Sequence, residues 1–281
     1  MKEMKDIVIN NFFPISNDKK IFVIAGPCQM ESRDHILMIA EKILKITQKL
    51  NINLIFKTSF DKANRTSING KRGIGLDLSL KIFEEIKKTF NVPLLTDIHN
   101  EKQPEQLSKI VDILQVPAFL CRQTDILEAV AKSGAIVNVK KGQFLSPNDV
   151  KGICEKLEHF NNNKILLTER GTTFGYNNLV VDMRGLEIMK NLTRYPIIFD
   201  ATHSTQAPGG LGNSSGGNRD MAFILARAAV SVGISGVFAE VHNDPDNAPS
   251  DGPCMLKLET FERFLKQIIL IDDVVKNNNI F

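Results

Sequence analysis

The chain has 281 residues, of which 43% are hydrophobic and 24% charged, with a formal net charge of +3 from 35 basic and 32 acidic side chains. No run approaches the roughly 18 apolar residues of a membrane helix, and the charges are too balanced for the basic face that nucleic acids require. We therefore expect neither a membrane nor a nucleic acid as a partner.

The N-terminal segment is predicted to form a small hairpin across residues 7–9 and 12–15. The first 20 residues lack the continuous apolar core and small-residue cleavage site of a secretory signal, so we expect a cytoplasmic location. The four cysteines are far apart and form no Cys-x-x-Cys pair, and in a reducing compartment they should remain thiols.

Short apolar runs then alternate with stretches of helical periodicity. The predicted strands cover residues 21–25, 54–56, 92–96, 113–116, 136–139, 165–168, 197–199 and 236–239. The predicted helices cover residues 32–50, 76–90, 101–110, 125–133, 147–160, 179–192, 220–232 and 256–275. About eight such units, without a composition break, favour one (β/α)₈ TIM barrel domain over residues 1–281, with a short N-terminal hairpin. The absence of a G-x-G-x-x-G after the first strand argues against a Rossmann fold.

In such a barrel the chemistry lies where the strands end. In chain order, the residues that follow the strands are Cys28, Lys57 with Lys62, Asp97 with His99, Gln115, Lys140 with Lys141, Glu169 with Arg170, Asp200 with His203, and Glu240 with His242. Each residue alone is more often a helix cap or a satisfied structural group. Gathering all of these charged and polar groups at one end of the barrel would cost free energy unless ligands or ion-pair partners compensated their charges.

Cations form the first chemically informative subset of these residues. Lys57, Lys62, Arg65, Lys140 and Arg170 would place at least four positive charges around one cavity. That is more than a single phosphate needs, so the pattern indicates two anionic groups or two anionic substrates.

A candidate metal site is the second subset. Cys28, His203 and Glu240 follow strands one, seven and eight, which become neighbours when the barrel closes, and Asp251 lies in the loop after strand eight. A thiolate, an imidazole and two carboxylates suit Zn, Fe, Mn or Co. At this point an inert, buried Cys28 remains the alternative.

Residues 209–217, with the sequence GGLGNSSGG, follow His203 closely. A Gly- and Ser-rich segment at this place is typical of a cover over an active site, and equally of a flexible connection. The sequence supports both interpretations equally.

Seven stretches together resemble 3-deoxy-D-manno-octulosonate 8-phosphate synthase. They are IAGPC, FKTSFDKANRTS, LLTDIH, QVPAFLCRQTD, NVKKGQF, ERGTTFGYNNLVVDMR and FDATHS, and the similarity covers nearly the whole chain. The family is a (β/α)₈ barrel, usually a homotetramer, that condenses phosphoenolpyruvate with D-arabinose 5-phosphate and water. It releases inorganic phosphate, and its product feeds the inner core of lipopolysaccharide.

This resemblance implies roles for individual residues. Lys140 and Arg170 would hold the phosphate of phosphoenolpyruvate, while Lys57, Lys62 and Gln115 would address its carboxylate end. The expected substrate-binding set is Lys57, Ser59, Lys62, Asn64, Arg65, Thr66, Asp97, Gln115, Arg122, Lys140, Arg170 and His203, and the expected catalytic set is Lys57, Lys62, Cys28, His203 and Asp251.

The resemblance also divides the sugar-phosphate site between residues of one loop and a neighbouring subunit. Asn64 would contact the sugar hydroxyls and Arg65 the phosphate of arabinose 5-phosphate. Thr66 stands where the family has Ser, and the hydroxyl survives. Arg122 is similar to the residue that reaches a neighbouring subunit's site.

The family has a metal-dependent form with Cys after Gly-Pro and a metal-independent form with Asn there. Cys28 therefore implies one divalent metal per subunit, with His203, Glu240 and Asp251 as further ligands and no organic cofactor. The run SDGPC around Asp251 is, however, similar to the metal-independent form, so the metal prediction depends mainly on Cys28.

Three alternative functions remain open. The nearest is 3-deoxy-D-arabino-heptulosonate 7-phosphate synthase, which takes erythrose 4-phosphate and has KPRT where this chain has KANRT at residues 62–66. The second is a Schiff-base aldolase that uses Lys57 or Lys140. The third is a sugar-phosphate binding protein without catalysis, which the presence of every candidate catalytic residue disfavours.

Overall fold

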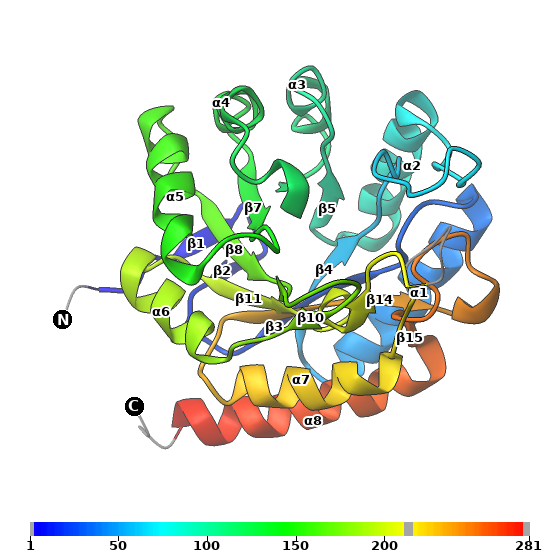
Figure 1. Cartoon of the computed structure of the whole chain (residues 1–281). Coiled ribbons are helices and arrows are strands. Elements are labelled where there is room, and N and C mark those ends of the chain that lie inside the picture. Colours follow the sequence, from blue (N-terminus) through cyan, green and yellow to red (C-terminus); the bar gives the residue numbers. More distant parts are fainter. Residues whose placement is uncertain (1–2, 211–215, 278–281) are drawn as a thin grey trace.

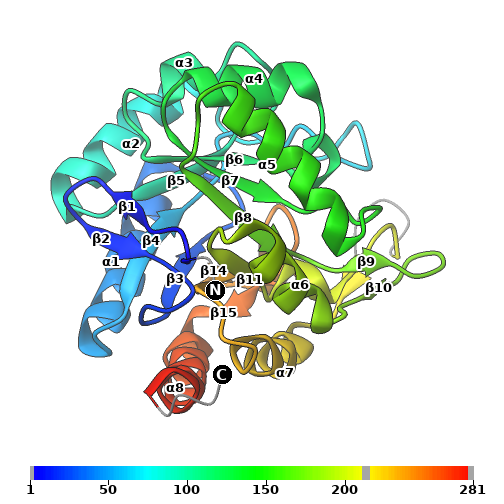
Figure 2. The same ribbon diagram turned by 90° about the vertical axis from the view of Figure 1, so that its left-hand side faces the viewer.

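The computed structural model describes residues 3–210 and 216–277 and contains a closed barrel of parallel strands surrounded by helices (Figure 1 and Figure 2). The barrel strands are β3 (Phe22–Gly26), β4 (Asn53–Lys57), β5 (Leu94–Asp97), β6 (Ile113–Val116), β7 (Ile136–Lys140), β8 (Ile165–Glu169), β11 (Ile197–Asp200) and β14 (Gly236–His242). The barrel closes because Val237 of β14 pairs with Val23 on one side and with Phe199 on the other. The predicted (β/α)₈ barrel with an N-terminal hairpin is confirmed.

Amphipathic helices form the outer layer of the barrel (Figure 2). They are α1 (Arg33–Lys49), α2 (Leu76–Phe90), α3 (Pro104–Leu107), α4 (Thr124–Lys132), α5 (Val150–His159), α6 (Arg184–Thr193), α7 (Arg219–Val230) and α8 (Leu258–Asn277). Helix α1 begins after Ser32, whose hydroxyl accepts a hydrogen bond from the backbone N–H of His35 at 3.2 Å. Its buried face includes Ile36, Ile39 and Ile43, at the spacing that predicted the helix.

The helix predicted at residues 179–192 is wrong at its start. Leu179 and Val180 form β10, which pairs with β9 (Thr172–Thr173), and α6 begins only at Arg184. An apolar pair inside a longer periodic run does not distinguish a short strand from a first helical turn. The hairpin of β9 and β10 belongs to the loop between β8 and α6.

Two other predicted helices also differ from the structure. The stretch 101–110 contains only the short α3, which begins at Pro104 because proline lacks an N–H and is favourable only in the first turn of a helix. The stretch 256–275 begins with β15 (Leu256–Lys257), which pairs with the end of β14, and α8 follows directly.

Four single-turn helices and one further strand pair complete the described elements. The short helices are η1 (Ala118–Leu120), η2 (Pro147–Asp149), η3 (His203–Thr205) and η4 (Pro245–Asn247). The strands β12 (Gln206–Ala207) and β13 (Gly216–Gly217) pair antiparallel at the two ends of the Gly-rich segment. Residues 211–215 of the predicted cover lie outside the described residues.

The hairpin of β1 (Ile7–Ile9) and β2 (Phe13–Ile15) lies across the end of the barrel where the strands begin, the end that faces the viewer in Figure 2. Its buried isoleucines belong to the main hydrophobic core. Directly after it, Asn17 donates to the carbonyl of Tyr195 and accepts from the N–H of Ile197, both at 2.9 Å. The hairpin therefore closes this end, and the opposite end is the open one.

Replacing Asn17 by Ala is expected to lower the free energy of unfolding by about 2–4 kcal/mol, because a buried carbonyl and a buried N–H would both lose their partner. Urea denaturation measures this change. The exposed Asn11 of the same segment is the matched control, and Asn11→Ala should change stability by less than about 0.5 kcal/mol. Equal stabilities of the two variants would show that the two hydrogen bonds of Asn17 do not stabilise this end of the barrel.

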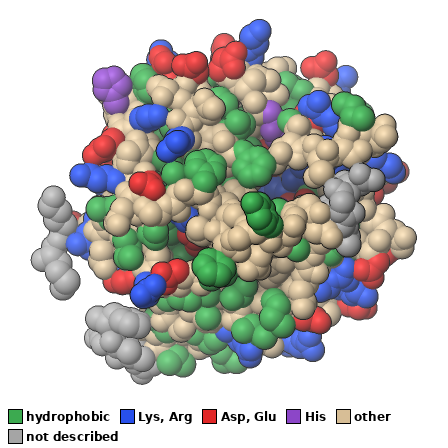
Figure 3. All heavy atoms as spheres, viewed as in Figure 1, with side chains coloured by type: hydrophobic (Ala, Val, Ile, Leu, Met, Phe, Trp, Pro, Cys, Tyr) green, Lys and Arg blue, Asp and Glu red, His purple; other side chains and the backbone are tan. Residues whose placement is uncertain are grey.

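The surface agrees with the balanced charge of the sequence. Figure 3 shows basic and acidic side chains interspersed over one face of the molecule, without a continuous stripe of one sign. Among the described residues, no helix combines the length and the apolar character needed to cross a membrane.

Candidate active site

A cavity of about 1030 Å³ opens at the end of the barrel where the strands finish. Of the predicted site residues, it is lined by Lys57, Lys62, Asn64, Arg65, Thr66, Asp97, Gln115, Lys140, Arg170, His203, Glu240 and Asp251. Cys28 and Ser59 do not line the cavity and are buried, while Arg122 is exposed outside it. The barrel therefore brings together residues that are up to about 190 positions apart in the chain.

Lys57, Glu240 and Lys62 form an ion-pair network at the base of the cavity. Lys57 Nζ donates to Glu240 Oε1 at 2.6 Å and to the carbonyl of Cys28 at 3.0 Å, and Lys62 Nζ lies 3.7 Å from Glu240 Oε1. Burial alone would raise the pKa of Glu240, but Lys57, His203 and Lys62 hold it well below its usual range. The carboxylate therefore stays ionised.

Asp97, at the end of β5, is the second anion of this region. It accepts hydrogen bonds from Ser59 and from the amide nitrogen of Gln115, and its Oδ2 lies 3.7 Å from Lys62 Nζ. Burial opposes its charge, yet Lys62 and Lys57 hold the pKa of Asp97 far below the ordinary value. Ser59 therefore acts from behind the cavity wall, through Asp97.

Lys140 at the end of β7, Asp200 at the end of β11 and His203 in η3 form a hydrogen-bonded cluster, in which Lys140 and Asp200 are buried and His203 is partly buried. Asp200 accepts from Lys140 Nζ and lies 2.7 Å from His203 Nδ1, while its other oxygen accepts the backbone N–H of His203 at 2.9 Å. Burial opposes ionisation of Asp200, but His203 and Lys140 keep its pKa well below its usual range. Because an ionised Asp200 can only accept, His203 Nδ1 carries the proton between them, and Nε2 points toward Glu240.

Arg170 has the features of an anion-binding residue. Its side chain is 5% exposed, it lines the cavity, and its Nη1 atom is buried without a hydrogen-bond partner in the described structure. Nη2 donates to the side-chain oxygen of Gln206. A buried guanidinium nitrogen without a partner is expected where an acidic ligand completes the arrangement.

Three of the four predicted metal ligands lie together beside the cavity, and the fourth, His203, approaches one of them. The ligand atoms of Cys28, Glu240 and Asp251 lie within 4.8 Å of one another. The thiol of Cys28 donates to Asp251 Oδ2 at 3.1 Å, and His203 Nε2 lies 3.6 Å from Glu240 Oε2. Asp251 adopts a left-handed backbone conformation with φ of 52°, which is uncommon for Asp and recurs at functional sites.

These four residues fit a divalent transition metal by two observations. Glu240 Oε2 is buried without a hydrogen-bond partner in the described structure, because Lys57 bonds to the other oxygen. His203 presents Nε2 while Asp200 holds Nδ1, the arrangement in which a carboxylate orients a metal-binding imidazole. Burial, with the carboxylates of Glu240 and Asp251, raises the pKa of the Cys28 thiol well above its usual value, so a bound cation would have to displace its proton.

Gly26 determines how closely Cys28 and Lys57 approach. A Cβ atom added to Gly26 would lie 1.9 Å from the backbone oxygen of Lys57, a distance at which the two strands could not pack. The absence of a side chain at residue 26 therefore lets the end of β3, which leads to Cys28, pack against the end of β4.

The loop after β4 carries the predicted sugar-phosphate residues Asn64, Arg65 and Thr66. Arg65 Nε donates to the carbonyl of Lys71 at 2.8 Å, and Nη2 donates to the carbonyl of Pro249 at 2.9 Å. These bonds tie the loop to the segment that leads to Asp251. Arg122 instead lies with its guanidinium carbon 5.6 Å from the ring centre of Phe144, outside the cavity.

A second group of possible metal ligands lies outside the cavity, at Glu31, His35 and His242. His242 Nδ1 accepts the backbone N–H of Asp244 at 3.0 Å, so its proton is on Nε2 and is donated to Glu31 Oε1 at 2.7 Å. Neither nitrogen of His242 is then free to bind a cation. We interpret this group as a structural hydrogen-bond cluster.

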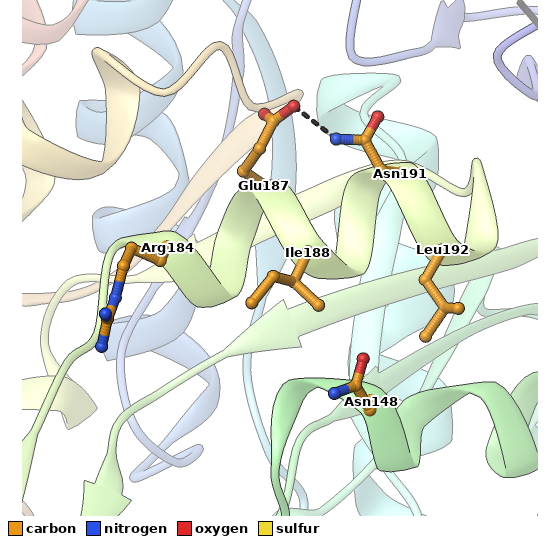
Figure 4. Close-up of a pocket in the computed structure, with 6 residues that line it drawn as sticks. All are labelled: Asn148, Arg184, Glu187, Ile188, Asn191 and Leu192. Carbon is orange, nitrogen blue, oxygen red and sulfur yellow. Dashed lines mark hydrogen bonds between the residues drawn. The ribbon is translucent and has the colours of Figure 1, made fainter.

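A shallow depression of about 590 Å³ on the outer surface of α6 has a different character (Figure 4). Figure 4 shows Ile188 and Leu192 of α6 on the side of the helix that faces Asn148. Arg184, Glu187 and Asn191 complete its lining, and none of the predicted site residues takes part. The candidate chemistry is therefore confined to the barrel mouth.

Three residues near the site were not predicted to bind a ligand. Asp200 orients His203 and Lys140, Gln206 joins Arg170 to Asp251 through a 2.8 Å bond to Asp251 Oδ1, and Ser250 donates to the Cys28 sulfur at 2.7 Å. The sequence did point to Asp200, because this residue follows a predicted strand. It gave no indication for Gln206 or Ser250, because the segments around them contain no periodic pattern.

Comparison with protein families gives a match to the DAHP synthetase I family over residues 6–277. Curated relatives include proteins of Rickettsia bellii (strain OSU 85-389) and Rickettsia prowazekii (strain Madrid E), each 57% identical over 273 residues, which are 97% of this chain and 99% of the relative. A protein of Rickettsia canadensis (strain McKiel) is 55% identical over the same shares. All three are named 2-dehydro-3-deoxyphosphooctonate aldolase. With its barrel, its cavity and a family match across nearly its whole length, this chain belongs to the DAHP synthetase I family.

Proposed function

We propose that this chain is a 2-dehydro-3-deoxyphosphooctonate aldolase, also called 3-deoxy-D-manno-octulosonate 8-phosphate synthase. It condenses phosphoenolpyruvate with D-arabinose 5-phosphate and water and releases inorganic phosphate, in a step of lipopolysaccharide inner-core biosynthesis. The main support for this proposal is the cation-rich cavity, in which Arg170 Nη1 is buried without a hydrogen-bond partner in the described structure. Relatives of that name at 55–57% identity support the choice of reaction.

The proposed reaction joins C3 of phosphoenolpyruvate to the aldehyde carbon of the sugar. Water adds at C2, and phosphate leaves from the resulting hemiketal. Lys140 and Arg170 hold the phosphate of phosphoenolpyruvate, while Lys57, Lys62 and Gln115 face its carboxylate. Burial opposes the charge of Lys62, but the carboxylates around it, including Glu240 and Asp97, raise its pKa, so it remains a cation for an anionic substrate.

The opposite side of the cavity is assigned to the sugar phosphate. Asn64 contacts the sugar hydroxyls, Arg65 the phosphate, and Thr66 supplies a hydroxyl in the same loop, all three lining the cavity. Arg122, exposed and outside the cavity, completes the site of a neighbouring subunit in a homotetramer. We place the enzyme in the cytoplasm.

Cys28, His203, Glu240 and Asp251 would hold one divalent ion of Zn, Fe, Mn or Co per subunit, which makes this the metal-dependent form. When bound, such an ion polarises an oxygen of the aldehyde or of water. Three observations support this assignment: the ligand atoms of Cys28, Glu240 and Asp251 lie together, His203 Nε2 approaches Glu240, and Glu240 Oε2 is buried without a hydrogen-bond partner in the described structure. Lys57 keeps Glu240 ionised and oriented, and Asp200 does the same for His203.

Phosphate release with the two competing sugars tests the reaction. With phosphoenolpyruvate, arabinose 5-phosphate should give turnover at least about tenfold faster than erythrose 4-phosphate, since the KANRT loop is built for the longer sugar. A tenfold preference corresponds to roughly 1.4 kcal/mol of transition-state discrimination. Faster turnover with erythrose 4-phosphate would instead make the chain a 3-deoxy-D-arabino-heptulosonate 7-phosphate synthase.

The Schiff-base alternative is tested on the same samples. Burial lowers the pKa of Lys140, which would favour a nucleophilic amine, but its bond to Asp200 keeps the ammonium in place. We therefore expect no adduct by mass spectrometry after borohydride treatment with either substrate. A trapped lysine adduct would show that the Schiff-base mechanism is correct, and binding of both ligands without phosphate release would indicate a binding protein.

A further inference from the structure

A chain of buried hydrogen bonds crosses four adjacent strands beneath the cavity. Thr168 on β8 donates to Asn138 Oδ1 on β7 at 2.7 Å, and Asn138 Nδ2 donates to Gln115 Oε1 on β6 at 2.8 Å. Gln115 Nε2 then donates to Asp97 on β5. Thr168 and Asn138 are fully buried and do not line the cavity, whereas Gln115 and Asp97 do.

The direction of this chain is determined by one charge. An ionised Asp97 can only accept, so Gln115 must turn its amide nitrogen toward it and its oxygen away. Asn138 must then offer its nitrogen to Gln115 and its oxygen to Thr168, whose hydroxyl has to donate. A uniformly directed chain of this kind fixes amide orientations that a single contact would leave free to flip.

We propose that Asn138 is a positioning residue for the anionic substrate, and that Thr168 completes its action. Together they hold the Gln115 amide so that one N–H bonds to Asp97 and the other remains available to the substrate carboxylate. The inference depends on the proposed function, because it takes that carboxylate to be the one of phosphoenolpyruvate. Neither residue touches the cavity, so both act only through Gln115.

Asn138→Leu and Thr168→Val test this role in the full-length chain. Leu removes both polar atoms of Asn138 at similar volume, and the dissociation constant for phosphoenolpyruvate in titration calorimetry should rise roughly tenfold or more. Thr168→Val removes one donor at the far end, and we expect a rise of about threefold. Thr168→Ser keeps the hydroxyl and should restore the affinity. The dissociation constant for arabinose 5-phosphate should stay within about twofold throughout.

Thr96→Val is the matched control, because the Thr96 hydroxyl on β5 is equally buried but has no hydrogen-bond partner in the described structure. It should leave both affinities unchanged. Thermal unfolding of each variant shows whether a loss of affinity comes from a loss of folded structure. If Asn138→Leu does not fold, Thr168→Val alone tests the inference.

Two results would overturn the inference. The first is that Thr168→Val and Asn138→Leu both fold and both bind phosphoenolpyruvate as tightly as the unmodified chain. The second is an equal loss of affinity for both substrates, which would indicate general destabilisation. Failure of the proposed function is recognised separately, on the unmodified chain. If that chain neither binds phosphoenolpyruvate nor releases phosphate from it, both the function and this inference are wrong.

Discussion

Cys28→Ala is expected to abolish stoichiometric metal binding and to lower phosphate release by at least about 100-fold, because it removes one of the three grouped ligands and leaves Glu240 and Asp251, with His203 nearby. Elemental analysis of the purified variant and competition with a chelator measure the binding directly. Exhaustive chelation of the unmodified enzyme should cause the same loss, and adding back Zn, Fe, Mn or Co should reverse it.

Cys154→Ala is the matched control for this experiment. Cys154 is a buried thiol on α5 and belongs to the hydrophobic core, so its replacement should cost some stability without changing metal content. Full activity of the unmodified enzyme after chelation would contradict the role of Cys28 as a ligand. It would also favour the metal-independent form of the family, to which the SDGPC run around Asp251 is similar.

Arg170→Met should raise the dissociation constant for phosphoenolpyruvate by roughly 10- to 150-fold, the range expected when hydrogen bonds to a charged group are lost from a buried site. Arg170→Lys keeps the positive charge but loses the planar, two-pronged guanidinium. Its dissociation constant should lie between those of the unmodified enzyme and Arg170→Met. Titration calorimetry and the KM for phosphoenolpyruvate measure the change.

Arg184→Met provides the comparison, because Arg184 is an exposed arginine that pairs with Asp182 on the outer surface. Its loss should leave substrate affinity unchanged, as expected for an exposed ion pair. If Arg170→Met and Arg184→Met bind phosphoenolpyruvate equally well, Arg170 is not the phosphate ligand.

The barrel could be predicted from the sequence because its strands are short, continuous apolar runs between amphipathic helices. The failures lie where local pattern and tertiary pairing compete. Leu179 and Val180 fit the start of a helix, yet β9 offers them a partner strand, and Lys257 fits α8 but pairs with the end of β14. Such pairings depend on distant segments, which periodicity cannot detect.

The site could be predicted as far as it follows from barrel closure. Glu240 pairs with Gly26 at the end of β3, and Cys28 follows two residues later, so their proximity follows from the fold alone. Gln206 and Asn138 were not predicted. Gln206 lies in β12, a strand of two residues that is too short to show a periodic pattern, and Asn138 lies inside an apolar strand, where nothing marks it as part of a polar chain. Their partners become apparent only from side-chain orientation.

The pairing of β15 with β14 has a consequence for the position of Asp251. Val241 pairs with Leu256 and His242 with Lys257, so the irregular segment between them is an excursion closed at its base. Closing a loop at its base removes much of the conformational entropy that its residues would otherwise lose on binding a ligand. The carboxylate of Asp251 is therefore held opposite Cys28 by the topology of the chain, before anything binds between them.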